Sequence, residues 1–147
     1  MCIMLYIAFF QIHKGINMAD IFDIFKRLEQ NKTAPSTTPI THLLVGLGNP
    51  GKQYALTRHN AGFLCMDTVC ETYHCPTDRS KFNALVGEAT IAGARVLLMR
   101  PQTYMNASGE AVAAAARFYK IEPAHIIVCS DDVSLDVGGM RVRGKGS

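Results

Sequence analysis

The chain has 147 residues, of which 48% are hydrophobic, 15 are Lys or Arg and 12 are Asp or Glu, so that its net charge is +3. This composition excludes a disordered chain and supplies enough apolar residues for one domain with a buried core. The small net charge permits a polyanionic partner but does not indicate one. The five cysteines contain no CxxC pair, and their odd number favours reduced thiols in a cytoplasm over a disulfide scaffold.

Residues 1–41 are expected to form an extension outside the folded domain. The apolar run MCIMLYIAFF is too short to span a bilayer, follows no basic residue and precedes no small-residue cleavage site, so we expect neither a membrane segment nor an export signal. Met18 begins a segment whose apolar residues recur at helical spacing, which predicts a short amphipathic helix. Met18 is therefore a candidate initiator, in which case residues 1–17 are not native. Residues 31–41, NKTAPSTTPIT, predict a linker.

Residues 42–147 predict a single α/β domain. Apolar runs predict strands, and two of these strands are expected to form a hairpin around a turn at Ala92–Ala94. Apolar residues at helical spacing predict two helices. The expected strands cover 42–47, 85–91, 95–100, 126–129 and 140–143, and the expected helices cover 61–73 and, capped by Asn106 or Ser108, the segment up to Tyr119. This order predicts a three-layer sandwich with a mostly parallel, mixed central sheet flanked by helices. Sites in such folds gather at the carboxyl ends of strands, where Asn49 and Asp131 are expected.

The segment Gly46–Gly51, GLGNPG, follows the first of these strands and fits the dinucleotide-binding pattern GxGxxG. A nucleotide-binding α/β domain is therefore one alternative. Two observations oppose it: Pro50 and the polar residues after Gly51 delay the next helix, and no second strand ends in an acid at the usual distance. We expect the glycines instead to let the backbone turn sharply and to hold Asn49 toward a cleft.

Four polar segments together indicate hydrolytic chemistry, although each alone has an ordinary structural explanation. Asn49 and Asn106 are amides at loop positions, His59 stands just before an apolar helix, and Asp131 ends a strand. These are a base, an acid that orients it and two polar amides, the groups needed to activate water against an ester. There is no convincing serine nucleophile motif. His74 and Cys75 have no second ligand pair nearby in the sequence, so we expect no metal site.

Three motifs, in this order and spacing, closely resemble the bacterial peptidyl-tRNA hydrolases: VGLGNPG at 45–51, YxxTRHNAG at 54–62 and RPQTYMNxSG at 100–109. The resemblance runs from about Thr41 to Ser147. It implies hydrolysis of the ester between a peptide and the 3′ ribose of tRNA by a cytoplasmic monomer, with no metal or organic cofactor. By matching position, His59 resembles the catalytic base and Asp131 its acidic partner. Asn49 and Asn106 resemble substrate-binding amides, and Tyr54 and Met105 resemble cleft-lining residues.

The tRNA backbone is expected to contact basic residues near the end of the chain, for which Arg141, Arg143 and Lys145 are candidates. The alternative for these three residues is ordinary solvated surface charge. Around Asp131 the chain reads SDDVSLDVGG, where the family usually has a stretch like DELDLPPG. The family also continues with a GGHNG segment, a further strand and C-terminal helices, which this sequence does not contain. The alternatives to an active enzyme are therefore an inactive fragment of a longer gene and a non-catalytic RNA-binding homologue.

Overall fold

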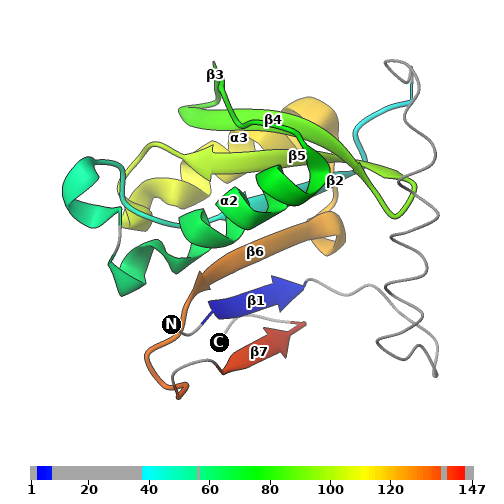
Figure 1. Ribbon diagram of the computed structural model, residues 1–147. Coiled ribbons are helices and arrows are strands. Elements are labelled where there is room, and N and C mark those ends of the chain that lie inside the picture. The colour runs from blue at the N-terminus through cyan, green and yellow to red at the C-terminus, as the bar shows by residue number, and fades with distance from the viewer. Residues whose placement is uncertain (1–2, 8–37, 56, 137–138, 145–147) are drawn as a thin grey trace, which may run out of the picture.

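A computed structural model of the chain describes residues 3–7, 38–55, 57–136 and 139–144. The strands of these residues form one mixed sheet in the order β3-β4-β5-β2-β6-β1-β7 (Figure 1). Their bounds are β1 Ile3–Ile7, β2 His42–Gly46, β3 Arg79–Lys81, β4 Ala84–Ile91, β5 Ala94–Pro101, β6 Ile126–Asp131 and β7 Met140–Arg143. The central strands β5, β2 and β6 run parallel, whereas β3, β4 and β5 form an antiparallel meander and β1 runs antiparallel to β6 and parallel to β7.

Two helices, α2 (Ala61–Tyr73) and α3 (Ser108–Tyr119), cover opposite faces of this sheet. In Figure 1, α2 lies in front of the central strands and α3 lies behind them. Short 3-10 turns stand at the helix and strand ends: η1 Lys52–Tyr54, η2 Arg58–Asn60, η3 Met105–Ala107 and η4 Pro123–His125. The arrangement confirms the predicted α/β sandwich with a mixed central sheet. None of the described helices is long and apolar enough to cross a membrane.

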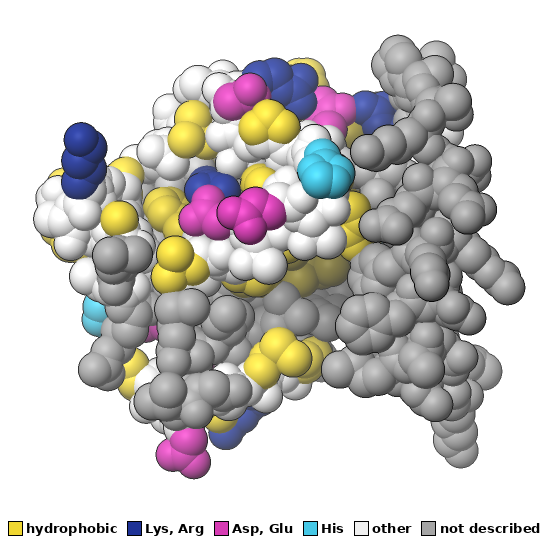
Figure 2. Space-filling model, viewed as in Figure 1, with side chains coloured by type: hydrophobic (Ala, Val, Ile, Leu, Met, Phe, Trp, Pro, Cys, Tyr) yellow, Lys and Arg dark blue, Asp and Glu magenta, His cyan; other side chains and the backbone are white. Residues whose placement is uncertain are grey.

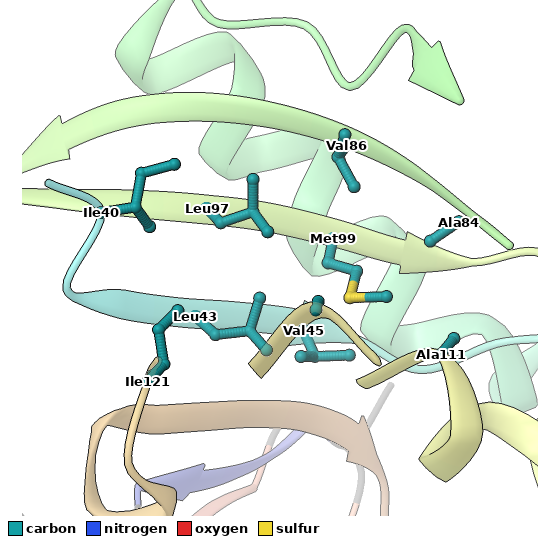
Figure 3. Packing of buried hydrophobic residues seen from close by; sticks show 10 residues of the cluster. Ile40, Leu43, Val45, Ala84, Val86, Leu97, Met99, Ala111 and Ile121 are labelled. Carbon is teal, nitrogen blue, oxygen red and sulfur yellow. The ribbon is translucent and has the colours of Figure 1, made fainter. Parts of the chain in front are cut away.

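The core has two layers because successive side chains of a strand point to opposite faces of the sheet. On β2, Leu43 and Val45 pack on the α3 side, and Leu44 packs on the α2 side. Figure 3 shows the α3-side layer, in which Leu97 and Met99 of β5 lie beside Leu43 and Val45. These four side chains have no exposed surface. Burying each of these side chains stabilises the domain by about 1.5–3 kcal/mol. Both faces of the central strands are therefore apolar, as their sequences predict.

The pattern of apolar residues along the sequence predicted the bounds of most helices and strands closely. The helix over 61–73 and the hairpin of β4 and β5 are confirmed, and α3 ends at Tyr119 as expected. The predicted cap of α3 is wrong: its N-cap residue is Ala107, which makes no side-chain capping bond. The reason is that η3 leads directly into the helix, so that Asn106 lies within η3 and Ser108 is already the first helical residue.

Two strands were not predicted. β1 lies in the apolar run that we assigned to the extension, and its place in the sheet comes from pairing with β6 and β7, far along the sequence. β3 has the polar sequence RSK, with no apolar alternation, and pairs with β4 at the edge of the sheet that the described residues form. The helix predicted from Met18 and most of the predicted linker lie outside the described residues. The part of that linker which is described includes Ile40, which is buried in the α3-side core.

Candidate active site

His59 and Asp131, 72 residues apart in the sequence, lie side by side at one end of the sheet. His59 belongs to η2, immediately before α2, and Asp131 is the last residue of β6. His59 Nδ1 is 2.8 Å from Asp131 Oδ2. The imidazole is 58% exposed and the carboxylate is 14% exposed. An accessible ring is thus held by an acid that is largely shielded from water.

The geometry of this pair sets the tautomer of the neutral ring. An ionised carboxylate can only accept hydrogen bonds, so Nδ1 carries the hydrogen and donates it to Asp131. The lone pair of the neutral imidazole is then on Nε2. The imidazolium that forms when Nε2 takes a proton is stabilised by the same carboxylate. This arrangement suits a general base.

Close packing of two glycines brings η2 to the end of β6. A Cβ on Gly62 would lie 2.3 Å from the carbonyl oxygen of Cys129 and 2.4 Å from the backbone nitrogen and oxygen of Leu47. A Cβ on Gly46 would lie 2.3 Å from the carbonyl oxygen of Gly62. Only glycine therefore lets the start of α2 approach β2 and β6 this closely, and the approach places His59 beside Asp131.

The expected role of the GLGNPG glycines needs correction. Gly46 and Gly48 do not adopt left-handed backbone angles but permit close contact, since a Cβ on Gly48 would lie 2.8 Å from the Phe63 ring. Only Gly51 of this segment has a positive φ, of 119°. Gly46 and Gly48 therefore permit close packing against α2, a role that differs from pyrophosphate binding.

Asn49 is fixed in its loop by two neighbouring segments. The side chain of Asn60, which is 2% exposed, accepts a hydrogen bond from the Asn49 backbone N–H (2.8 Å) and donates one to the Asn49 carbonyl (3.0 Å). Asn49 Oδ1 accepts a bond from the backbone N–H of Met105 (3.0 Å). Its Oδ1 is used in this way, whereas its Nδ2 group, a hydrogen-bond donor, has no partner in the described part of the chain.

The other predicted cleft residues stand on the turns around this loop. Met105 begins η3 and is joined to Asn49 through its backbone, and Asn106 follows it with an exposed side chain. Tyr54 is half-buried at the end of η1, where its carbonyl accepts a bond from the Thr57 hydroxyl (2.8 Å). The structure thus joins Asn49 to Met105 and His59 to Asp131 through direct hydrogen bonds. Among the described residues, neither Tyr54 nor Asn106 forms such a bond with another predicted site residue.

The segment after Asp131, where the sequence departs from the expected pattern, forms a polar turn. Asp132 Oδ1 accepts bonds from the Ser134 backbone N–H (2.8 Å) and hydroxyl (2.6 Å). These bonds from Ser134, followed by the charges of Arg141 and Arg143, lower the pKa of Asp132. Arg141 Nη1 is 3.9 Å from Asp132 Oδ2, so Arg141 lies near the end of β6, and Arg143 is close enough for its charge to act on Asp132. Lys145 lies outside the described residues.

Surface charge does not mark a nucleic-acid surface on the face in front of α2. Figure 2 shows this face, where acidic and basic side chains alternate over short distances instead of forming a patch of one sign. No cluster of three or more metal-binding side chains occurs among the described residues. The groups that the structure brings together at the candidate site are amides, an imidazole and a carboxylate.

Comparison with known proteins decides the family. The family model for peptidyl-tRNA hydrolase matches residues 43–147. The chain belongs to the peptidyl-tRNA hydrolase family. A peptidyl-tRNA hydrolase of Caldicellulosiruptor bescii is 50% identical over 106 residues, which are 72% of this chain and 56% of that protein. One of Clostridium botulinum (strain Loch Maree) is 53% identical over 106 residues, again 72% and 56% of the two chains.

The structures agree with this membership. The crystal structure of the Acinetobacter baumannii peptidyl-tRNA hydrolase superposes with a TM-score of 0.56 and 42% sequence identity, covering 63% of this chain and 47% of that one. The chain spans a little more than half the length of the peptidyl-tRNA hydrolases of known sequence that it matches. The family match covers Asn49, His59, Asn106 and Asp131 together.

Sequence reasoning missed Asn60. It lies within the YxxTRHNAG motif, but nothing in its local pattern distinguishes a buried amide from an exposed one. Its two bonds to the backbone of Asn49 depend on the fold bringing η2 against the loop after β2.

Proposed function

We propose that this domain hydrolyses the ester bond between peptide and tRNA in peptidyl-tRNA, and so recycles tRNA during translation. The observation that carries the proposal is the 2.8 Å contact of His59 Nδ1 with Asp131 Oδ2, in a chain of the peptidyl-tRNA hydrolase family. Its relatives in Caldicellulosiruptor bescii and Clostridium botulinum bear the name of this activity. Because the chain spans only part of their length, the tests use the 147-residue chain itself.

In the proposed reaction, His59 is the general base and Asp131 orients it. Nε2 of His59 takes a proton from water as the water oxygen bonds to the ester carbonyl carbon, and the carbonyl electrons move to the oxygen. The tetrahedral intermediate then expels the ribose oxygen of the tRNA 3′ end, which takes the proton from the imidazolium. No group outside the protein, the substrate and water is required. General-base assistance of this kind is worth about 10² to 10⁴ in rate.

The amides are proposed to hold the substrate over His59. Asn49 is suited to this role because Asn60 and Met105 fix its backbone and Oδ1, which leaves Nδ2 to donate to a carbonyl oxygen. We assign Asn106, exposed on the neighbouring turn, to the same cleft, with Tyr54 and Met105 lining it. A donor fixed before the substrate arrives stabilises a developing oxyanion without reorganisation.

The tRNA is proposed to lie along the edge formed by β7, where Arg141 and Arg143 reach its phosphates. Both are half-buried and lie next to the turn that follows Asp131, so this edge adjoins the proposed catalytic pair. Lys145 extends the same proposal beyond the described residues. Phosphate contacts position a nucleic acid without reading its sequence, as an enzyme acting on many tRNAs requires. We further propose that the protein acts as a monomer in the cytoplasm.

The first test is release of labelled peptide from a peptidyl-tRNA by the chain and by His59→Ala. We expect the variant to lose at least 10²-fold in turnover, with an unchanged circular dichroism spectrum, because the ring is 58% exposed. His74→Asn is the matched control: His74 is an exposed histidine at the opposite end of α2, in a left-handed conformation that asparagine tolerates. Equal turnover in wild type and His59→Ala would overturn the assignment.

The second test concerns tRNA binding. Arg141→Ala with Arg143→Ala should weaken tRNA binding and reduce the dependence of binding on salt, since each lost phosphate contact lowers the slope by roughly 0.7 to 0.9. Arg117→Ala, at an exposed arginine near the end of α3, is the control. An unchanged slope in the β7 variant would refute the proposed edge. A chain that binds tRNA but releases no peptide would be an RNA-binding homologue instead.

A further inference from the structure

Two thiols face each other behind the proposed catalytic pair. Cys65 of α2 and Cys129 of β6 have sulfur atoms 3.6 Å apart. Cys129 has no exposed surface, whereas Cys65 is half-buried. Both are free thiols in this structure, and the proposed hydrolysis uses neither. A pair of thiols at this distance with one accessible member can react with an oxidant.

We propose that Cys65 and Cys129 form an oxidation site, where a peroxide converts the two thiols to a disulfide that ties α2 to β6. Their positions on the chain connect this site to the proposed activity. Cys65 follows His59 by six residues, through η2 and the first turn of α2, and Cys129 precedes Asp131 by two residues on β6. The disulfide would therefore join the two elements that carry the base and its acid.

Cys65 is the residue that reacts first. The hydrogen bond between the two sulfurs lowers the pKa of Cys65 to about 7, whereas the same hydrogen bond, followed by burial and the charge of Cys65, raises the pKa of Cys129. Near neutral pH, a substantial fraction of Cys65 is thus the thiolate, which is the nucleophilic form. Cys65 is also the partly exposed member of the pair, so a small oxidant such as hydrogen peroxide meets it before Cys129.

The reaction proceeds in two steps. The Cys65 thiolate attacks one peroxide oxygen, an S–O bond forms, the O–O bond breaks, and the hydroxide that leaves takes a proton to become water. The Cys129 sulfur then attacks the sulfenic sulfur of Cys65, the S–S bond forms, and the S–O bond breaks. The second hydroxide takes the Cys129 proton. Two thiols and one peroxide give one disulfide and two waters, and a dithiol reverses the change.

The packing of α2 on β6 brings the segments that carry the two cysteines close together. Gly62, one turn before Cys65, packs so closely on β6 that a Cβ there would lie 2.3 Å from the Cys129 carbonyl oxygen. The two sulfurs must approach by about 1.5 Å to reach the disulfide length of about 2.05 Å. Side-chain rotation together with a small shift of α2 against β6 supplies this movement, and the shift also moves His59 relative to Asp131.

The first experiment maps the bond and does not depend on catalysis. Cleavage before aspartate gives fragments 23–66, 67–77 and 78–130, so that Cys65, the pair Cys70 and Cys75, and Cys129 are separated. After hydrogen peroxide treatment, we expect 23–66 joined to 78–130, lighter than their sum by two hydrogens and separated again by dithiothreitol. In Cys129→Ala, dimedone should trap a sulfenic acid on Cys65. The matched control Cys70→Ala should form the same bond.

The mapping has clear contrary outcomes. The proposed oxidation site would be overturned if fragments 23–66 and 78–130 stayed separate under peroxide. It would also be overturned if fragment 78–130 were linked mainly to fragment 67–77. The amount of linked fragment over time also gives the rate of bond formation at each pH. This rate should reach half its maximum near pH 7, where Cys65 loses its proton. A rate that does not change between pH 6 and pH 8 would contradict the proposal that the Cys65 thiolate reacts first.

The second experiment measures peptide release before and after oxidation and rests on the proposed function. We expect the disulfide form to release peptide at least about tenfold more slowly, because a misplacement of 1 Å in a catalytic group costs on the order of 100-fold. Dithiothreitol should restore the rate, and Cys65→Ala should be insensitive to peroxide. Full activity with the bond mapped would overturn the link to His59. Inactivity of the reduced chain would count against the proposed function alone, since the mapping is independent of it.

Discussion

Replacement of Gly62 by alanine tests the packing that assembles the site. A methyl group there would lie 2.3 Å from the Cys129 oxygen and 2.4 Å from both the nitrogen and the oxygen of Leu47. These are all backbone atoms, and two of them form the 2.9 Å hydrogen bond from Leu47 N–H to the Cys129 carbonyl. No side chain can rotate to make room, so either α2 moves away from the sheet or this hydrogen bond lengthens.

The magnitude follows from three terms. Overpacking of a well-filled interior costs about 1–3 kcal/mol, and loss of one hydrogen bond costs about 1 kcal/mol. Alanine in place of glycine within a helix returns about 0.5–1 kcal/mol. We therefore expect Gly62→Ala to lower the free energy of unfolding by about 1–3.5 kcal/mol. We also expect slower peptide release, because the same movement of α2 displaces His59.

Urea denaturation followed by circular dichroism measures the effect, and Gly109→Ala is the matched control. Gly109 is likewise the second residue of its helix, but a Cβ there meets nothing within 4 Å. The control should gain about 0.5–1 kcal/mol from helix propensity, whereas Gly62→Ala should shift the midpoint to lower urea by roughly 1 M. If both variants were more stable than wild type, the role of Gly62 argued above would be refuted.

Three further predictions concern other parts of the domain. Asn60→Ala should lower the free energy of unfolding by about 1–3 kcal/mol, because the Asn49 N–H and carbonyl lose their partner. The variant should also raise KM for peptidyl-tRNA, and a KM equal to that of wild type would contradict the role of Asn60 in positioning Asn49. Leu97→Ala should cost about 2–5 kcal/mol in urea denaturation, since Leu97 has no exposed surface; a loss below 1 kcal/mol would argue against the packing in Figure 3. Burial, followed by the charge of His125, lowers the pKa of His42 below its usual 6.5. The unfolded chain then binds more protons, so the free energy of unfolding should fall as pH drops through 6.5 toward the folded pKa. In His42→Gln, the free energy of unfolding should fall less steeply over the same pH range.

Short-range pattern in the sequence was sufficient for the local elements. The helical spacing over 61–73 and the stop at Pro76 predicted α2, and the apolar runs around Ala92–Ala94 predicted the hairpin of β4 and β5. These elements depend on side chains close together in the sequence. The three motifs around Asn49, His59 and Met105 also led from the sequence to a resemblance with the family that the comparison confirms.

Long-range contacts decided the rest. The strand β1 exists through its pairing with β6 and β7, which no local pattern reports. The distance between His59 and Asp131 depends on Gly46 and Gly62 allowing α2 to approach the sheet, and the orientation of Asn49 depends on Asn60 and Met105. The facing thiols of Cys65 and Cys129 arise from the same approach. Residue types and their order are written in the sequence, whereas these contacts join residues far apart in it, and only the packed fold sets their distances.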